Sequence, residues 1–269
     1  MKLFLDTMEN NNFKFPPIFV INLPKDKDRK DFMDGQLKDM GMEYEFIEGR
    51  LGTDTDVIAS CDDDLAIKEH GKILTKGEKG CAYSHRFVYE KMLKENIKVA
   101  VIMEDDVVIP KNFKEIIEKE ISRKNRNWDW LSFDYPLVGF RFVTSWIQAS
   151  IYMTKNKPIF FLYALAKFPF IVVVSIFDFV RDILAKIFPI YAGPKIFYRP
   201  LYNAGAYMIT EEGIKKMKPL LYPIRFSADR TPNRARVKLD FTMRWYVPRV
   251  VHQMLEDDRN RFPSNTLVD

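Results

Sequence analysis

The sequence has few cysteines and lacks long uncharged apolar runs. Its two cysteines, Cys61 and Cys81, form no CxxC pair, which excludes a disulfide framework and favours free thiols in a reducing cytosol. Residues 1–12 hold only three apolar residues in a row, too few for a signal peptide. Lys167 interrupts the most hydrophobic segment, and no run of about 18 uncharged apolar residues occurs, so we expect no membrane-spanning helix. These absences predict that the main domain stays in the cytoplasm.

The sequence also lacks a strong excess of either charge, since the net charge is only +5 and the pI is about 8.9. This mild excess suits an anionic lipid, a nucleotide or a phosphorylated glycan, and we expect no nucleic-acid partner. Hydrophobic residues make up 47% and charged residues 29%, the mixture of an ordinary globular protein. A length of 269 residues fits one large α/β domain, or one domain with an insertion.

The pattern of apolar residues alternates between short β-branched runs and amphipathic helices. This order predicts an α/β fold with a mostly parallel sheet, flanked by helices and joined by right-handed crossovers. We expect strands over 16–24, 43–50, 98–109 and 128–136, helices over 25–42, 74–96 and 112–124, an irregular loop over 52–70, a strand, turn and helix over 201–221, and a last short strand over 248–254.

A hydrophobic segment over 140–199 interrupts this pattern and is expected to be a helical insertion. Within it, residues 170–188 have two faces, which suits a helix lying in a membrane interface. The alternative is that residues 158–188 pack on the core or on a second subunit. The polar face holds Ser175, Asp178, Asp182 and Lys186, and the apolar face holds Phe177, Val180, Leu184 and Ile187. Basic residues that could meet anionic head groups are Arg181, Lys186, Lys195 and Arg199.

Three consecutive acids, Glu104, Asp105 and Asp106, end the most hydrophobic strand of the pattern. The carboxyl end of a parallel strand is where α/β folds bind ligands, and oxygen ligands suit Mn²⁺ or Mg²⁺. We predict that Asp106 contacts the metal, while Glu104 faces the metal or the ribose. His252 is a further candidate metal ligand from the last strand, with a structural role as its alternative. The acidic triplets at 62–64 and 256–258 lie in polar surroundings, and we expect both to be solvated.

Four more segments accompany this cluster: "VINLPKDKDR", "LTKGEKGCAYSH", "YNAGAYMIT" and "VPRVVHQ". Together with "VAVIMEDD" they resemble the signature of glycosyltransferase family 25, over roughly residues 16–135 and 200–254. The matching residues outside the acidic cluster are Asn22, Leu23, Arg29, Gly77, Glu78, Gly80, Cys81, Ser84, His85, Gly205, Ala206, Tyr207, Pro248 and Gln253.

The resemblance implies a GT-A-type fold and an inverting transfer of a sugar, most often galactose, from a UDP-sugar with the help of Mn²⁺ or Mg²⁺. It implies a lipopolysaccharide, lipooligosaccharide or other lipid-linked glycan as acceptor. We expect the amphipathic insertion to hold the protein at the cytoplasmic face of the inner membrane, where such acceptors are displayed. It divides the chain into a nucleotide-sugar-binding part (14–139), the insertion (140–199), an acceptor-side part (200–254) and a tail (255–269). The residues it assigns to the donor are Asn22, Leu23, Arg29, Gly77, His85, Glu104 and Asp105. The alternatives are a glucose or N-acetylglucosamine transferase, and a non-catalytic, membrane-associated sugar-binding or scaffold protein of the same fold.

Inversion needs one general base near the acceptor hydroxyl. The resemblance places an Asp in this region, and Asp229 and Asp240 both qualify, with Asp229 preferred; either is alternatively a helix N-cap. His85 binds phosphate or substrate, or is a helix histidine satisfied by a backbone carbonyl. Arg29 pairs with the diphosphate or lies on a solvated helix, and Glu78 holds the acceptor or caps a helix.

Overall fold

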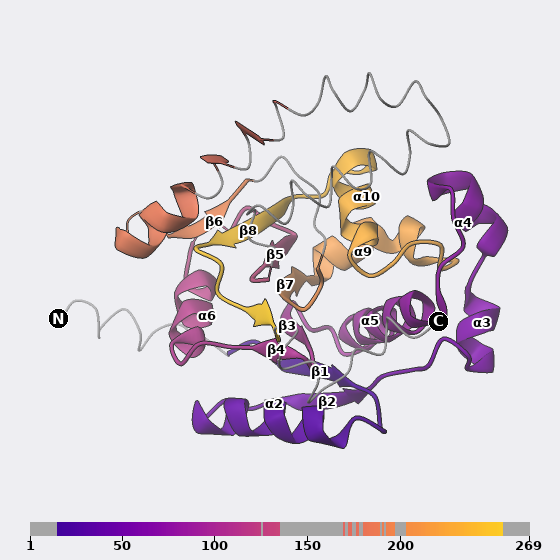
Figure 1. Ribbon diagram of the computed structural model, residues 1–269, viewed down its shortest axis with the longest axis horizontal. Coiled ribbons are helices and arrows are strands. Elements are labelled where there is room, and N and C mark those ends of the chain that lie inside the picture. Colours follow the sequence, from indigo (N-terminus) through magenta and orange to yellow (C-terminus); the bar gives the residue numbers. More distant parts are fainter. Residues whose placement is uncertain are drawn as a thin grey trace.

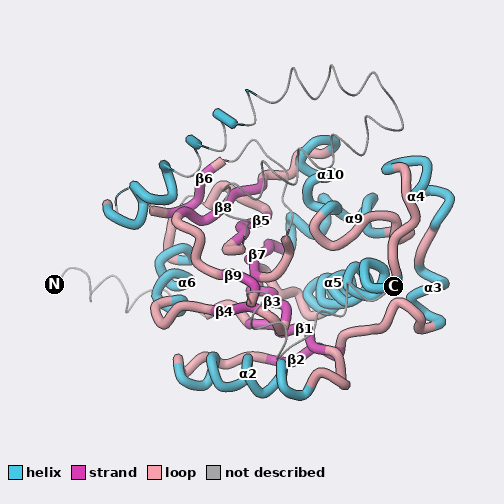
Figure 2. The backbone as a smooth tube through the Cα atoms, in the orientation of Figure 1, coloured by secondary structure: helices cyan, strands magenta, loops and turns pink. Residues whose placement is uncertain are grey.

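The computed structural model describes residues 15–124, 126–134, 169, 172–173, 176–177, 180–188, 190, 192–196 and 203–254. Figure 1 shows a central sheet with helices on both sides, and Figure 2 distinguishes the helices, strands and loops. Most of the insertion and the whole tail lie outside the described residues, and so do Ser175, Asp178 and Arg199.

A seven-stranded sheet forms the centre of the fold, in the order β2-β1-β3-β7-β5-β8-β6. Five strands run in one direction, whereas β7 and β6 run against them. The strands are β1 (Ile18–Asn22), β2 (Glu45–Glu48), β3 (Val99–Glu104), β5 (Trp130–Ser132), β6 (Gly193–Lys195), β7 (Ala206–Thr210) and β8 (Met243–Val247). The predicted α/β class with a mostly parallel sheet is therefore confirmed, with two reversed strands that the sequence pattern did not indicate.

Helices cover both faces of this sheet. Successive residues of a strand point to opposite faces, so β1 and β3, which are buried on both faces, are apolar almost throughout. One face packs against α5 (Lys76–Lys94), α9 (Glu211–Leu221) and α10 (Arg230–Lys238). The other face packs against α2 (Lys27–Asp39) and α6 (Phe113–Ile121). The carboxyl ends of β1, β3 and β5 consequently meet at one edge of the sheet.

The structure corrects the sequence prediction in two segments, 52–70 and 243–254. Residues 52–70, expected to be a loop, contain α3 (Thr55–Ser60) and α4 (Asp63–His70). Their apolar residues are too few to give a clear helical period, and α4 is instead started by Asp62, whose side chain accepts a hydrogen bond from the backbone N–H of Leu65. The last strand is shorter than expected: β9 is only His252–Gln253 and pairs with β4 (Val107–Val108), while β8 precedes the predicted 248–254 segment.

The described part of the insertion includes helical residues 180–187 and β6. The carboxylate of Asp182 accepts a hydrogen bond of 2.8 Å from the backbone N–H of Arg249, and Nη1 of Arg181 donates to the carbonyl of Ile196 over 3.2 Å. This helix therefore lies against β6 and the segment after β8. In the part of the chain that the structure describes, no helix is both long and apolar enough to span a membrane.

Candidate active site

The acids at the end of β3 lie in three different environments. Glu104 is the last residue of the strand, and Asp105 and Asp106 form the turn that leads into β4. Asp105 is directed towards β1 and α2, where it meets Asn22 and Arg29, whereas Glu104 is directed towards His85 in α5. These different directions separate Glu104 from Asp105, while Asp105 and Asp106 share the nearby guanidinium of Arg29.

Asp105 is held by two residues from the first strand and helix. Its Oδ2 accepts a hydrogen bond of 2.8 Å from Nδ2 of Asn22, at the end of β1. Its Oδ1 accepts one of 3.0 Å from Nη1 of Arg29, in α2, and both partners of this ion pair are buried. Burial raises the pKa of Asp105, and the charge of Arg29 opposes the rise. Arg29 is thus neither on a solvated face nor pointing to open solvent, and it also lies 3.8 Å from Oδ2 of Asp106.

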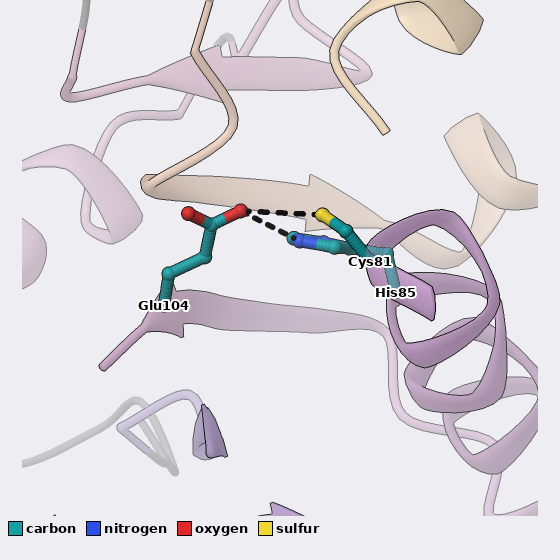
Figure 3. Close-up of side chains that lie close together, drawn as sticks. All are labelled: Cys81, His85 and Glu104. Carbon is teal, nitrogen blue, oxygen red and sulfur yellow. Dashed lines mark hydrogen bonds and ion pairs between the residues drawn. The ribbon is translucent and has the colours of Figure 1, made fainter. Parts of the chain in front are cut away.

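Glu104 turns to the opposite side and meets α5 (Figure 3). Its Oε1 lies 3.2 Å from Nε2 of His85 and accepts a hydrogen bond of 3.5 Å from Sγ of Cys81. Beyond it, Nδ1 of His85 and the hydroxyl of Tyr207 are 2.7 Å apart, as are the hydroxyls of Tyr207 and Tyr89. Burial alone would raise the pKa of Glu104, but the hydrogen bond and charge of His85 hold it below its usual value. His85 therefore orients Glu104, and its partners are side chains rather than a backbone carbonyl.

Cys81, His85 and Glu104 each offer one ligand atom within 4.8 Å of the others. A sulfur, nitrogen and oxygen set of this kind suits zinc better than Mn²⁺ or Mg²⁺. Without a metal, burial and the charge of Glu104 raise the pKa of the Cys81 thiol well above its usual value, so metal binding here would have to release its proton. Hydrogen bonds already join the three side chains, and the raised pKa of Cys81 keeps its thiol protonated in the metal-free protein.

Two other carboxyls at this edge have oxygens that the described residues leave without partners. They are Oδ1 of Asp106 and Oδ1 of Asp134, both buried. Burial raises the pKa of both side chains to about 7, helped by the charge of Glu104 and, for Asp106, also by those of Asp105 and Asp134. Arg29 lowers the pKa of Asp106, but not enough to offset these effects.

Asp134 was not among the predicted site residues. It follows β5 in "WDWLSFDYP", directly after a strand that the pattern did predict, at the same sheet edge as Glu104. The rule that ligands bind at the carboxyl ends of parallel strands could have identified it. A lone Asp in a loop is too common a feature to have done so without the strand order.

The two candidate bases lie in contrasting places. Asp229 occupies the N-cap position of α10, but its side chain makes no capping hydrogen bond and instead accepts one of 2.6 Å from Oγ of Ser227. Burial raises the pKa of Asp229, and the charge of Glu104 adds to the rise, so these two carboxyls are within electrostatic reach of each other. Asp240 is exposed just after α10. The geometry favours Asp229, and the base assignment itself stays a prediction.

The side chains of His252 and Gln253, the two residues of β9, point to opposite sides of the strand. Nε2 of Gln253 donates a hydrogen bond of 3.4 Å to Oε2 of Glu104. Adjacent residues of a strand point to opposite faces, so the ring of His252 is directed away from Glu104. Burial lowers the pKa of His252. Its role as a metal ligand stays a prediction, while Gln253 is the residue of this strand that contacts the cluster.

With this geometry in place, the sequence can be compared with known proteins. The sequence model of glycosyltransferase family 25, described as LPS biosynthesis protein, matches residues 15–231, which is most of the chain. The chain belongs to glycosyltransferase family 25.

Three relatives illustrate the range of this family. A procollagen galactosyltransferase 1-A of Xenopus laevis is 26% identical over 133 residues, covering 44% of this chain and 21% of the relative. The lipooligosaccharide biosynthesis protein lex-1 of Haemophilus influenzae is 37% identical over 67 residues, covering 25% and 20%. A probable inactive glycosyltransferase 25 family member 3 of Bos taurus is 31% identical over 125 residues, covering 43% and 21%. The chain thus spans about a fifth of the length of each of these curated relatives.

The family segment "LTKGEKGCAYSH" begins α5, and its residues have clear structural roles. Thr75 and Glu78 form a reciprocal capping box, in which each side chain accepts a hydrogen bond from the backbone N–H of the other. A Cβ on Gly80 would lie 2.4 Å from the carbonyl oxygen of Arg50, so this glycine lets α5 approach the loop after β2. Of the two expectations for Glu78, the helix cap is the one observed. The donor-binding roles of Gly77 and Leu23 stay predictions.

Proposed function

We propose that this family 25 chain is a metal-assisted, inverting glycosyltransferase that uses a UDP-sugar. The observation that carries the proposal is the pair of buried carboxylate oxygens without described partners, on Asp106 and Asp134, at the ligand-binding edge of the sheet. Buried polar atoms are nearly always satisfied, so such a pair calls for a missing partner. A hard divalent cation is the partner that carboxylate oxygens fit best.

Mn²⁺ or Mg²⁺ at this edge would be held by Asp106 and would supply charge neutralisation for a leaving diphosphate. The residues of the chain then have distinct tasks. Arg29 and Asn22 fix the turn that carries Asp106 by holding Asp105. His85 fixes the orientation of Glu104. The site is therefore organised before any ligand arrives, which is what efficient electrostatic stabilisation requires.

Asp229 is the proposed general base. Its carboxylate would accept the proton of the acceptor hydroxyl while the oxygen forms a bond to the anomeric carbon and the bond from that carbon to the diphosphate oxygen breaks. A carboxyl with a raised pKa is a stronger base than an ordinary aspartate, because catalysis is most efficient when the pKa approaches the working pH. Ser227 donates to this carboxylate and orients it.

The proposed donor is UDP-galactose, and the proposed acceptor is a lipopolysaccharide, lipooligosaccharide or other lipid-linked glycan. The names of the relatives support both choices, since one is a galactosyltransferase and another a lipooligosaccharide biosynthesis protein. UDP-glucose and UDP-N-acetylglucosamine are the alternative donors.

Turnover of a panel of UDP-sugars with Mn²⁺ tests the proposal. We expect the wild type to release UDP from at least one of them, and Asp106→Asn to lower kcat at least about 100-fold, the loss seen when one electrostatic stabiliser is removed. Asp240→Asn is the matched control, because it removes the same charge from an exposed position. A wild type that turns over no UDP-sugar, or one whose turnover ignores both Mn²⁺ and Asp106, contradicts the proposal.

A second candidate function is a non-catalytic sugar-binding or scaffold protein, since one relative is named probable inactive. Sugar-nucleotide binding without turnover in the same panel would favour it. The intact acidic edge with its unpartnered oxygens favours the enzyme.

We also propose that the chain attaches to the cytoplasmic face of a membrane through the helix that contains residues 180–187. Asp182, from the polar face of this helix, is buried against the protein and pairs with Lys186 over 2.9 Å. The opposite face is apolar and exposed, the arrangement of an interfacial helix. Its exposed residues include Phe177, Val180, Leu184 and Ile187.

Flotation with vesicles that contain anionic lipid tests this attachment. We expect the wild-type protein to float with the vesicles and the double variant Val180→Glu, Leu184→Glu not to float, because both charges would enter the apolar interface. Val237→Glu on α10 is the control, since it places the same charge at another exposed apolar position. Unchanged flotation of the double variant would remove the membrane proposal.

A further inference from the structure

Asp134 sits at a fixed place beside the acidic end of β3. It follows β5, and its backbone N–H donates to the carbonyl of Ala206 over 3.3 Å while the residue bridges to Val251. Strands β3 and β5 are separated only by β7, as Figure 1 shows. Two strand spacings amount to about 10 Å between the backbones. The side chains reach across part of this separation, since the charge of Asp134 contributes to the raised pKa of Asp106.

The side chain of Asp134 is completely buried but only half satisfied. Its relative exposure is 0%, and its Oδ2 accepts a hydrogen bond of 3.2 Å from Nδ2 of Asn203. Its Oδ1 has no hydrogen-bond partner among the described residues. A buried acceptor that is left unsatisfied destabilises the folded protein, and more so if it is charged, so a purely structural role gives this arrangement no benefit.

Gly205 brings Asp134 and Glu104 towards one another. A Cβ on Gly205 would lie 2.7 Å from Oδ2 of Asp134 and 3.5 Å from Cγ of Gln253. The carbonyl of Gly205 accepts the backbone N–H of Glu104 over 2.8 Å, and Gln253 in turn contacts the carboxylate of Glu104. The missing side chain of Gly205 therefore leaves the space in which Asp134 lies next to the acids of β3.

We propose that Asp134 is a ligand of the divalent cation, sharing it with Asp106, and that Asp105 is not a ligand. This inference rests on the proposed function, because it concerns the cation of that site. Two carboxylates from different strands, each with one buried oxygen to offer, form a suitable oxygen site. Asn203 orients Asp134 as an outer-shell hydrogen-bond donor does in other metal sites. We assign Asp105 to the structure of the turn instead, because each of its oxygens already accepts a hydrogen bond from Asn22 or Arg29.

Calorimetric titration with Mn²⁺ alone, without nucleotide, tests the assignment. We expect Asp134→Asn to weaken Mn²⁺ binding at least about 10-fold, the minimum loss expected when even an outer-shell partner is removed. The control is Asp129→Asn, at the opposite end of the same strand. Asp129 is also buried, but Lys216 and the backbone N–H of Thr242 satisfy it.

The two variants should show opposite effects. Asp129→Asn should lower the stability of the metal-free protein and leave Mn²⁺ affinity unchanged, whereas Asp134→Asn should lower affinity without lowering that stability. A third variant, Asp134→Cys, offers a soft ligand at the same position. We expect it to bind Cd²⁺ with a thiolate charge-transfer absorption above the background of the wild type, which contains Cys81.

The outcomes separate this inference from the proposed function. Equal Mn²⁺ affinity of the wild type and Asp134→Asn, or a wild type that binds no Mn²⁺, overturns the assignment, whether or not UDP-sugars turn over. Mn²⁺ binding that depends on Asp134 in a protein without any turnover supports the assignment and contradicts the transferase.

Discussion

Arg29 is the residue whose removal should most clearly test this description of the acidic edge. Its guanidinium pairs with Asp105 at 3.0 Å, and the two side chains are only 9% and 10% exposed. Arg29→Met retains helix propensity and most of the apolar stem but leaves Asp105 buried without its cation. Removing one partner of a buried ion pair typically costs about 3–5 kcal/mol, so the free energy of unfolding should fall by that amount.

Urea unfolding of four proteins measures this cost: the wild type, Arg29→Met, Asp105→Asn and the double variant. We expect the double variant to be more stable than Arg29→Met, because Asn at 105 still accepts the hydrogen bond from Asn22 without burying a charge. Lys38→Met is the matched control on the same helix, since Lys38 pairs with Asp34 at 2.7 Å in an exposed position. Its cost should stay below about 1 kcal/mol. If Arg29→Met costs no more than this control, Arg29 does not hold the turn.

Three further predictions follow from the same edge. Asp106 and Asp134 have pKa values of about 7 in the folded protein against 3.8 when unfolded, so they contribute stability that is present below pH 3.8 and lost as the pH rises through about 7. Mn²⁺ should therefore raise the melting temperature more at about pH 8, where both carboxyls are ionised, than at about pH 5.5. An equal rise at both pH values would contradict this. His85→Phe should lower the free energy of unfolding in urea by about 1–3 kcal/mol, because it removes the imidazole partner of Glu104 and leaves only the longer contacts with Cys81 and Gln253. An unchanged midpoint would show that the contact is unimportant. Gly205→Ala should cost about 1–3 kcal/mol by crowding Asp134, as measured by the same method, and a tolerated alanine would show that this edge can relax.

The central strands and the main helices could be predicted because their apolar periods are long and unambiguous. α5, for example, combines a capping threonine with a buried stripe that includes Val88 and Met92. By contrast, α10 has a polar sequence, "RTPNRARVK", with no clear apolar period, so only its packing against α9 and β8 reveals it as a helix. The direction of a strand could not be predicted either, because nothing in the local sequence "AYMIT" indicates that β7 runs antiparallel to β3.

The candidate site was predictable to the extent that it lies in one segment of the chain. The end of the strand at 104–106 was visible, because three acids interrupt a buried run. The different contacts of the three acids could not be predicted, because they depend on residues distant in sequence: Arg29 lies 76 positions from Asp105. Asp134 was missed for the same reason, because its nearness to Glu104 follows from the position of β7 between two strands that are not consecutive in the chain.

Charge balance explains how one sheet edge tolerates so many acids. Glu104 is stabilised by His85, and Asp105 by Arg29, so these two have local partners. Asp106 and Asp134 are stabilised less: Arg29 lies 3.8 Å from Asp106, and Asp134 has the hydrogen bond from Asn203 and the more distant charge of Arg249. Without a ligand they respond by retaining protons near neutral pH, which is what their raised pKa values of about 7 mean. Two protons and one divalent cation carry the same charge, and they compete for the same oxygens. The pH dependence of stability and the binding of the cation are therefore expected to be properties of the same two side chains.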